Sequence, residues 1–404
     1  MTRRVKHVVL CCLLGLGVLF LPATTLGQSG EASILGHIRD ASGGVIANAT
    51  ITVTNADTGL KRTVQSSGEG AFAVINLPPG NYHIEATYAG FANLQQDFGL
   101  LVSQSQDLNL ELRPAGQAVK VDVEASVPLV ETNTATLHKN ITPQQVTELP
   151  IDGRNFTTLA TLVPGVTSAN TAVNQNYDPV KRNVPAISIN GQSGRNLYMT
   201  IDGGDNTDLF MGGQNINLSL EAVQEFDVIT HDPKASYPRG IGGVITVVTK
   251  SGSNTFHGSG FGYFRNDGYG KIDAISEAAG KPKPPFSSQQ FGGTIGGPIL
   301  KDRLFFFYSY ERDRNTTSRV FNSNGAFPAL DGTATPQPFR QNLQTARLDG
   351  RINQNHTWFA RYSEQDNITA NEFFSDQEAP GPNAGANETN KLHDTSMAFA
   401  IRHE

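Results

Sequence analysis

The stretch from Leu218 to Asn266 constrains the fold most, because its pattern changes within a few residues. Phe226–Ile229 and Gly242–Thr249 are β-branched runs of the kind that form buried strands. After the polar turn Lys250–Asn254, the segment Phe256–Arg265 mixes glycine with aromatic residues, as a long strand of a wide sheet does. We expect a small buried sheet before this turn and a long-stranded sheet after it.

The composition favours an all-β protein, because glycine, threonine, asparagine and aromatic residues are plentiful and helical patterns are sparse. A chain of 404 residues has room for two or three domains. Its formal net charge of −6 comes without a basic block, which argues against a nucleic-acid partner. Both cysteines, Cys11 and Cys12, lie in the N-terminal apolar run, so the rest of the chain offers no disulfide and no cysteine-based metal site.

Residues 1–27 have the pattern of a secretory signal peptide. Basic residues up to Lys6 precede the apolar core Val8–Leu21, and small residues at 25–27 form the cleavage site. A membrane anchor is the alternative, but the apolar run is short for a span of about 20 residues. No other continuous apolar stretch is long enough for a transmembrane helix, so entry into a membrane would require a barrel.

Residues 31–113 are predicted to form a compact β-sandwich, because short alternating runs such as Ala49–Val53 and Tyr82–Ala86 are separated by turn residues. At Gly36–Asp40 and Leu77–Tyr82 the segment resembles carboxypeptidase regulatory-like domains. The resemblance implies a spacer or a binding module, and carbohydrate is the ligand to consider, because related sandwiches bind starch. No HxxE or HExxH spacing accompanies the segment, so we expect neither zinc nor peptidase activity there.

Residues 136–252 are predicted to form a small α+β domain with short helices. Thr142–Gln145 combines a threonine cap, a proline at the first helical position and a glutamine three residues after the cap. A second helix is expected over Gly153–Leu162. Ser219 is expected to cap a third, short helix that carries Glu221 and Glu225.

The strands of this α+β domain are expected at Ile187–Ile189, at Tyr198–Ile201 and at the two buried runs named above. Asp202–Asp208 is interpreted as a turn, because it lacks the sixth-position glycine and the closing glutamate of an EF-hand calcium loop. The nine histidines are scattered and form no ligand cluster, so no metal site is predicted.

Residues 255–404 are predicted to contain the opening strands of a large barrel. Asp302–Arg312 is the most informative segment, because its length suits a tilted membrane strand and its aromatic residues suit a lipid–water girdle. A soluble core can also hold Leu304–Tyr310, so the membrane interpretation depends on the neighbouring strands. The candidate strands are Phe256–Arg265, Gln289–Gly296, Arg303–Arg314, Asn342–Asn353, His356–Gln365 and Asp394–His403.

Polar, proline-rich stretches at 271–288, 315–341 and 366–391 are expected to be the longer outer loops. About six strands do not close a membrane barrel, since closed bacterial examples start near eight. An open edge in hydrocarbon leaves backbone groups unpaired, each at a cost of several kcal/mol. We therefore expect the chain to be the N-terminal part of a longer protein.

Four short motifs occur in a characteristic order: Glu148–Val166, Val248–Gly252, Phe256–Ser259 and Phe291–Ile299. In this order they resemble TonB-dependent outer-membrane receptors of the Oar-like group. The resemblance implies a mainly β fold with a β-sandwich domain, then an α+β plug domain, then the first strands of an incomplete transmembrane β-barrel. It also implies a location in the bacterial outer membrane after signal-peptide removal, and TonB-energised uptake of a bulky solute.

Residues 114–135 are interpreted as a linker in which Ala118–Ala125 alternates apolar and charged residues. In TonB-dependent receptors a segment before the plug pairs with an edge strand of TonB, and main-chain pairing tolerates varied sequence. The same pattern also fits the first strand of the plug. The resemblance places the TonB-pairing segment at Val119, Lys120, Val121, Asp122 and Val123.

The partners that the resemblance implies are TonB, outer-membrane lipid and an unknown extracellular ligand. The candidates for contact with ligand or with the barrel wall are Arg195, Arg239 and Arg265, but plug arginines of such receptors more often pair with barrel acids. The alternative function is a surface carbohydrate- or protein-binding, adhesin-like outer-membrane protein without transport. An accessory role in a peptidase is suggested only by the sandwich resemblance.

The sequence predicts no enzymatic chemistry. It contains no nucleophile triad, no paired-carboxylate site and no phosphate loop. Gly240–Gly243 is glycine-rich, but it precedes its strand and has no following lysine–serine pair. We therefore expect no catalytic residues, no cofactor and no bound metal.

Overall fold

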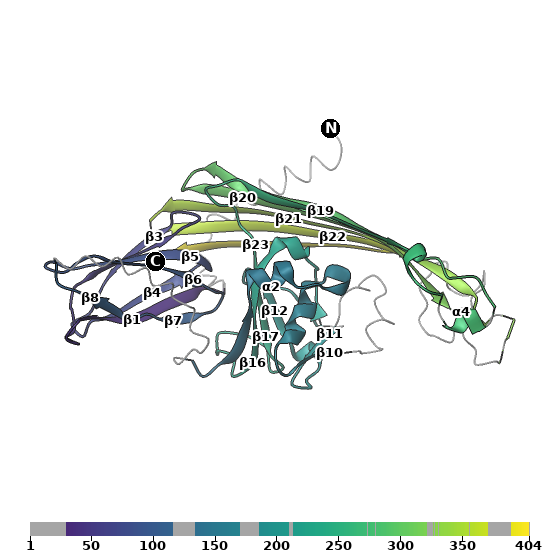
Figure 1. Cartoon of the computed structure of the whole chain (residues 1–404), viewed down its shortest axis with the longest axis horizontal. Coiled ribbons are helices and arrows are strands. Elements are labelled where there is room, and N and C mark those ends of the chain that lie inside the picture. Colours follow the sequence, from purple (N-terminus) through teal and green to yellow (C-terminus); the bar gives the residue numbers. More distant parts are fainter. Residues whose placement is uncertain are drawn as a thin grey trace.

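The architecture comes from a computed structural model, which describes residues 30–115, 134–169, 186–209, 213–272, 274–278, 280–320, 326, 328–329, 331–354, 356–370 and 389–403. The fold is mainly β and has three parts along the chain (Figure 1). A sandwich lies at one end, a compact α+β unit lies in the middle, and a long, curved sheet arches over that unit (Figure 1). The described helices include none long and apolar enough to cross a membrane.

The N-terminal part is a sandwich of two four-stranded sheets, as its alternating sequence predicted. One sheet has the order β4-β1-β7, with β8 also pairing with β1, and the other has the order β3-β2-β5-β6. Alternate residues of each sheet point inward, so that Ile34, Ile51 and Ile84 are fully buried between them. The strands are β1 (Ala32–Asp40), β2 (Thr50–Asn55), β3 (Lys61–Gln65), β4 (Ala71–Leu77), β5 (Gly80–Thr87), β6 (Leu94–Leu100), β7 (Ser105–Asp107) and β8 (Leu110–Leu112).

The middle part is built on a five-stranded mixed sheet with the order β13-β12-β17-β16-β9. The buried runs of the sequence became its centre, since β17 and β16 pair antiparallel and β17 also pairs with β12 in parallel. Almost every residue of β16 and β17 is buried, which matches strands covered on both faces. The strands are β9 (Leu137–Ile141), β12 (Tyr198–Ile201), β13 (Gly204–Asp205), β16 (Val223–His231) and β17 (Val244–Thr249).

Short helices and hairpins complete this α+β unit. Helix α2 (Pro143–Glu148) begins with the predicted capping box. The Thr142 hydroxyl accepts from the backbone amide of Gln145, and the Gln145 side chain accepts from the backbone amide of Thr142. The remaining small elements are β10 (Val166–Ala169), β11 (Ala186–Ile189), η4 (Gly194–Asn196), β14 (Thr207–Asp208) and β15 (Gly213–Gln214).

The second predicted helix is wrong as an α-helix. The segment forms two 3₁₀ turns, η1 (Asp152–Arg154) and η2 (Phe156–Leu162). Gly153, in the middle of the first turn, has a φ of 68°, a left-handed conformation that interrupts a continuous helix. The Asn155 side chain then caps the second turn.

The third predicted helix is present only in part. Only the single 3₁₀ turn η5 (Leu220–Ala222) forms, and Ser219 makes no capping hydrogen bond. Its hydroxyl donates to Glu311 of the arched sheet at 2.5 Å. Glu225, expected on this helix, lies in strand β16 and is buried. Contacts with distant residues therefore outweighed the local helix signal.

The C-terminal part is a six-stranded antiparallel sheet in sequence order, from β18 to β23. All six predicted strands are present, but several are longer than expected. Residues 315–320 and 334–341, expected to lie in an outer loop, extend β20 and β21, which stay paired as far as Val320 and Ala334. Polar residues on both faces hid this extension in the sequence. The strands are β18 (His257–Asn266), β19 (Ser287–Leu300), β20 (Leu304–Val320), β21 (Ala334–Asn353), β22 (His356–Ala370) and β23 (Thr389–His403).

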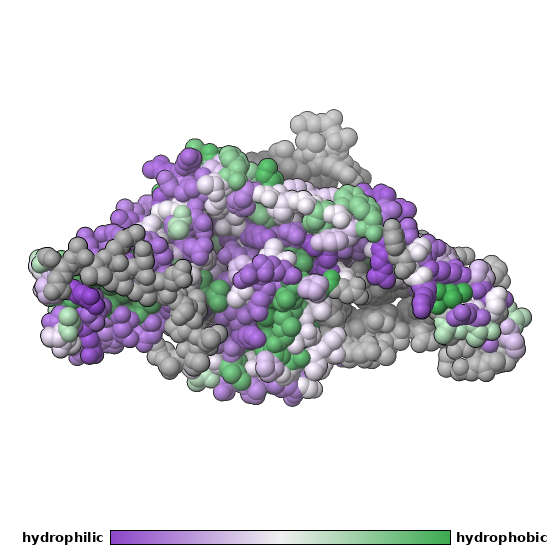
Figure 2. Space-filling model, viewed as in Figure 1, coloured by the Kyte–Doolittle hydropathy of each residue, from purple (hydrophilic) through white to green (hydrophobic). Residues whose placement is uncertain are grey.

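The two faces of this sheet differ. The concave face covers the α+β unit, and there Phe307, Ser309 and Glu311 are buried. The opposite face leaves Tyr308 and Met397 exposed, so Leu304–Tyr310 does not lie inside an ordinary two-sided core. Figure 2 shows apolar patches along the upper side of the arch with hydrophilic residues beside them. The sheet is open: among the described strands, β18 and β23 form its two edges.

Candidate functional site

The strongest contact between the α+β unit and the sheet centres on Asp202, at the end of β12. Its Oδ1 lies 2.9 Å from Arg347 of β21, and its Oδ2 lies 2.9 Å from Arg361 of β22. Thr249, the last residue of β17, donates to the same carboxylate from its amide at 2.9 Å and from its hydroxyl at 2.8 Å. One carboxylate therefore joins two strands of the unit to two strands of the sheet.

The charge of Asp202 is stabilised within the protein. Burial alone would raise the pKa of the carboxyl group, but Arg347, Arg361 and the hydrogen bonds from Thr249 outweigh burial and hold that pKa below its ordinary value. Arg347 also binds Asp349 through two nitrogens and donates to the carbonyl oxygen of Thr249 at 3.1 Å. The cluster is therefore a buried, mutually neutralised ion network.

A second polar contact lies between the short turns of the α+β unit and strands β18 to β20. Arg154 donates to Glu221 at 3.0 Å, and its Nε lies 3.9 Å from Glu311 of β20. Its guanidinium also stacks 4.0 Å from the ring centroid of Phe261 on β18. Arg154 follows the pairing expected for plug arginines, although it was not among the predicted residues.

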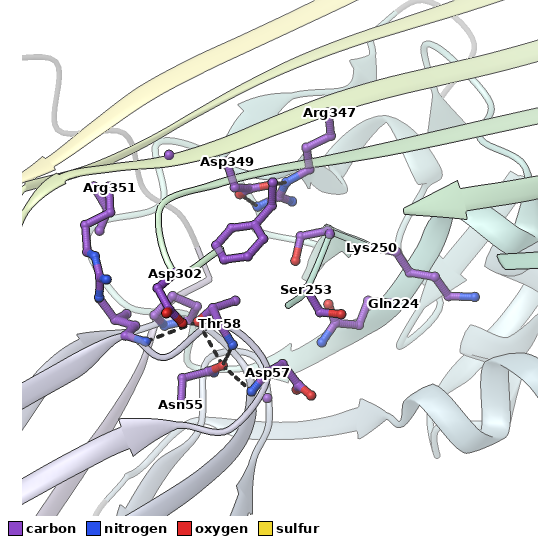
Figure 3. Close-up of a pocket in the computed structure, with 18 of the residues that line it drawn as sticks. Asn55, Asp57, Thr58, Gln224, Lys250, Ser253, Asp302, Arg347, Asp349 and Arg351 are labelled. Atoms are coloured by element: carbon purple, nitrogen blue, oxygen red, sulfur yellow. Dashed lines mark hydrogen bonds and ion pairs between the residues drawn. The ribbon is translucent and has the colours of Figure 1, made fainter. Parts of the chain in front are cut away.

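A pocket of about 430 Å³ lies where the sandwich, the α+β unit and the sheet meet (Figure 3). It opens beside the hairpin turns of the sheet at 301–303 and 353–356. Short turns of this kind are found on the periplasmic side of outer-membrane barrels. The lining includes Asn55, Asp57, Thr58, Gln224, Lys250, Ser253, Asp302, Asp349, Arg351 and Trp358.

Hydrogen bonds hold the sandwich against both other parts around this pocket. Arg351 donates to the carbonyl oxygen of Gly59 at 3.1 Å. The backbone amide of Asn254 donates to the carbonyl oxygen of Asp57 at 2.9 Å. The Asn254 side chain in turn donates to Asp302 at 2.7 Å. The turn after β2 is thus fixed to the segment that links the α+β unit to the first long strand.

The sandwich also contacts β16 through a buried carboxyl group. The amide of Val102 donates to Glu225 at 2.6 Å, and Asn140 of β9 donates to the Val102 carbonyl at 2.6 Å. Burial, with a smaller contribution from nearby Asp227, raises the pKa of Glu225 to about 8 against the hydrogen bond from Val102. Glu225 is therefore mainly protonated at neutral pH in this arrangement.

The structure brings together few of the residues singled out in the sequence. Val119, Lys120, Val121, Asp122 and Val123 lie outside the described residues. Arg239 pairs with Asp205 of the α+β unit at 2.5 Å, and Arg265 stacks on Phe286 at 4.8 Å. Neither pairs with an acid of the sheet among the residues that the structure describes. The expected pairing joined arginines of the α+β unit to acids of the sheet. The main ion pairs instead join arginines of the sheet, Arg347 and Arg361, to Asp202 of the α+β unit.

One group with metal-ligating side chains escaped the sequence analysis. Glu364, Asp366 and His393 bring one ligand atom each within 4.8 Å of one another. They meet because β22 and β23 pair Asp366 opposite His393, a register that the sequence did not show. His393 already contacts Asp366 at 2.5 Å and is exposed.

The comparisons with known proteins agree with this layout. A family described as "Carboxypeptidase regulatory-like domain" matches residues 33–113, and one described as "Outer membrane beta barrel domain" matches residues 248–331. The TonB-dependent transporter Oar of Myxococcus xanthus is 28% identical over 297 residues, which cover 69% of this chain and 26% of that protein. The chain is therefore similar to a TonB-dependent outer-membrane transporter. The barrel-domain match and this relative indicate a location in the outer membrane.

Two solved outer-membrane receptors are similar to this chain in structure. A mutant ferric enterobactin receptor of Pseudomonas aeruginosa with bound enterobactin aligns with a TM-score of 0.50 and 16% identity, covering 66% of this chain and 38% of that one. The siderophore receptor PirA of Acinetobacter baumannii aligns with a TM-score of 0.47 and 21% identity, covering 66% of this chain and 37% of that one. The chain thus spans about a quarter of the curated relative and under two-fifths of these receptors. After the receptors that it resembles, we call the α+β unit the plug and the arched sheet the barrel sheet.

Proposed function

We propose that this chain forms the sandwich, plug and first barrel strands of a receptor that imports a bulky solute with energy from TonB. The division that we propose is 31–113 for the sandwich, 114–135 for the linker, 136–252 for the plug and 255–404 for the barrel segment. The supporting observation is the buried contact of Asp202 with Arg347 and Arg361, which holds a separate folded unit against the barrel strands.

This contact suits a plug that stays in place until it is pulled. Breaking one partner from a buried ion pair costs about 3–5 kcal/mol, because the other charge is left buried. Thermal motion would then rarely separate the plug from the barrel strands. Force applied near β9 would act on the five-stranded sheet, which carries Asp202 at the end of β12. Strand β9 is the edge strand next to the linker, and it pairs only with β16 among the described strands.

The proposal includes no covalent chemistry. The relatives named above are receptors or transporters, and we infer a binding and transport role for this chain as well. The partners that we propose are TonB on the periplasmic side, lipid around the barrel and an extracellular solute above the plug. The sandwich sits at the periplasmic end, where it would not meet that solute first.

The TonB step is tested at Val121 in protein produced from its complete reading frame. Strand pairing uses backbone groups, so Val121→Pro removes a donor and should weaken binding of the purified periplasmic TonB domain at least tenfold. Val121→Thr is the matched control, because threonine keeps the amide and suits a strand, and it should bind within twofold of the native protein. Equal binding by both variants and the native protein would remove Val119–Val123 as the coupling segment.

A further inference from the structure

On the outward face of the barrel sheet, the strand register places residues of neighbouring strands opposite one another, in rows that run across the strands. Phe306, Leu348, Ala360 and Phe399 lie opposite one another across four strands. Two residues further from the short turns, the next row is Tyr308, Ala346, Tyr362 and Met397. These rows carry no charged side chain, and their exposed members include Met397 at 72% and Phe399 at 60%. They form the apolar band that faces lipid.

The upper limit of this band is marked by tyrosines whose hydroxyl groups point away from it. The Tyr308 hydroxyl bonds to Gln344 one row higher at 3.0 Å, and the Tyr310 hydroxyl bonds to Asn342 at 3.2 Å. The Tyr362 hydroxyl likewise reaches Glu364 at 3.1 Å. Tyrosines placed with their rings in lipid and their hydroxyls in the headgroup layer have this arrangement.

Three arginines follow directly above these tyrosines on the outward face. Arg312 and Arg314 are on β20, and Arg340 on β21 lies directly opposite Arg314. Strand geometry places them at the membrane boundary. Leu304 to Arg314 is ten steps, or about 33 Å along the strand. A tilt of about 40° leaves about 25 Å of height, which equals the height of the apolar band of such barrels.

The three guanidinium groups have no anionic partner among the described residues, since no ion pair joins any of them to a carboxylate. The Nε of Arg312 is buried and makes no hydrogen bond. Like charges placed directly opposite on neighbouring strands destabilise a sheet. Arg314 and Arg340 are such a pair, and the described residues supply no carboxylate to offset their repulsion. An anion held between them would remove this repulsion.

The acidic side chains on this face lie further along the sheet. Glu364 and Asp366 are on β22, and His393 on β23 contacts both, at 3.8 Å and 2.5 Å. Neighbouring strands are about 4.8 Å apart, so β22 is about 10 Å from β20. These carboxylates therefore have a partner of their own and leave the outer end of β20 and β21 positively charged.

We propose that Arg312, Arg314 and Arg340 form a site on the outside of the barrel for the phosphate group of an outer-leaflet lipid. A guanidinium binds phosphate oxygens through two parallel hydrogen bonds, and arginine is suited to such planar recognition. The lipid chains would lie along the apolar rows below, next to Tyr308 and Tyr310. Such a lipid would orient the barrel in the membrane. The inference depends on the outer-membrane location and not on solute import.

The test uses protein from the complete reading frame in detergent micelles, with fluorescent phosphatidic acid as the probe. The Arg314→Gln/Arg340→Gln variant should bind this lipid at least tenfold more weakly than the native protein. The matched control is Arg303→Gln, an exposed arginine on the short turn at the opposite end of β20, which should change binding less than twofold. Arg314→Lys/Arg340→Lys keeps the charges and should lose less binding than the glutamine variant.

Heat-dependent gel mobility shows whether each variant is folded. If Arg314→Gln/Arg340→Gln does not fold, Arg340→Gln alone is measured, and it should bind the lipid at least threefold more weakly than the native protein. Inorganic phosphate at the lipid's concentration should not compete, because it lacks the chains that lie on the apolar rows. Equal binding of phosphatidic acid and phosphatidylcholine, full competition by inorganic phosphate, or an equal effect of Arg303→Gln would each overturn the proposal.

Discussion

Arg347 of barrel strand β21 donates to Asp202 of the plug at 2.9 Å, although 145 residues separate them in the sequence. The contact is buried on both sides, and Arg361 of the next barrel strand shares the same carboxylate. Plug and barrel are therefore joined by an ion network around one side chain.

Asp202→Asn should weaken the attachment of the plug by about 3–5 kcal/mol, because two buried guanidinium groups lose their shared charge. The measurement is the rate of limited proteolysis of the plug in folded, membrane-inserted receptor. Asp205→Asn is the matched control, since Asp205 forms a half-exposed pair with Arg239 and such pairs contribute about 0–1 kcal/mol. Equal proteolysis rates for the two variants would contradict the role of Asp202.

Glu225 should make the contact between sandwich and plug depend on pH. Burial raises its pKa from an ordinary 4.5 to about 8, so the folded state binds the proton more tightly than the unfolded state does. Its contribution to stability is then full below about pH 4.5 and is lost as pH rises to about 8.

Thermal unfolding of the sandwich, followed between pH 5 and pH 9, checks this prediction. The Glu225→Gln variant keeps an oxygen to accept from Val102 but does not titrate, so its unfolding temperature should change less over this range than that of the native protein. Glu111→Gln is the control, because Glu111 is exposed on β8. An identical pH dependence of the native protein and Glu225→Gln would show that another group is responsible.

Gly252→Ala should reduce the yield of folded receptor. A Cβ at Gly252 would lie 2.7 Å from the carbonyl oxygen of Gly297 and closer still to that of Phe306. Both atoms belong to the backbone, so relief requires a shift of the sheet, at about 1–3 kcal/mol. Gly260→Ala is the control, since a Cβ there meets nothing within 4 Å. The folded fraction is measured by heat-dependent gel mobility. Equal folded fractions for Gly252→Ala and Gly260→Ala would contradict the clash at Gly252.

Replacing Arg351 by alanine should loosen the sandwich from the barrel turn while leaving the plug in place. Its hydrogen bond to the Gly59 carbonyl is charge-assisted and partly buried, and such bonds contribute about 1–3 kcal/mol. Hydrogen exchange should rise in the turn after β2 and stay unchanged in β16 and β17. Faster exchange throughout the plug would mean that Arg351 supports the whole assembly.

The parts of the fold that could be predicted from sequence depend on local patterns. The capping box at Thr142 and the buried strand expected at Gly242–Thr249 need only residues next to one another. The capping box is present, and the strand forms over Val244–Thr249. Glu225 was misplaced because acidic residues after Ser219 resemble a helix start, whereas the sheet partners Val248 and Ile141 draw the segment into β16. Tertiary contacts overrode local preference there.

The candidate site was largely missed for a related reason. Asp202 stands in a glycine-rich turn, and its sequence gives no sign that Arg347 and Arg361 converge on it. That convergence follows from the register of β21 and β22, which pairs those two arginines directly opposite each other. An aspartate at the end of a fully buried strand was the one available signal, since a charge there requires a partner.

The account is tested most directly by asking which side chains face lipid. Met397 and Ile75 are both exposed and apolar, at 72% and 56%, but Met397 lies on the outward face of the barrel sheet and Ile75 on the sandwich. Single cysteines are placed at each position in protein from which Cys11 and Cys12 have been removed, and membranes are treated with lipid-soluble or water-soluble maleimides. The account predicts that Met397→Cys reacts only with the lipid-soluble reagent and Ile75→Cys with the water-soluble one. Rapid reaction of Met397→Cys with the water-soluble reagent would contradict it.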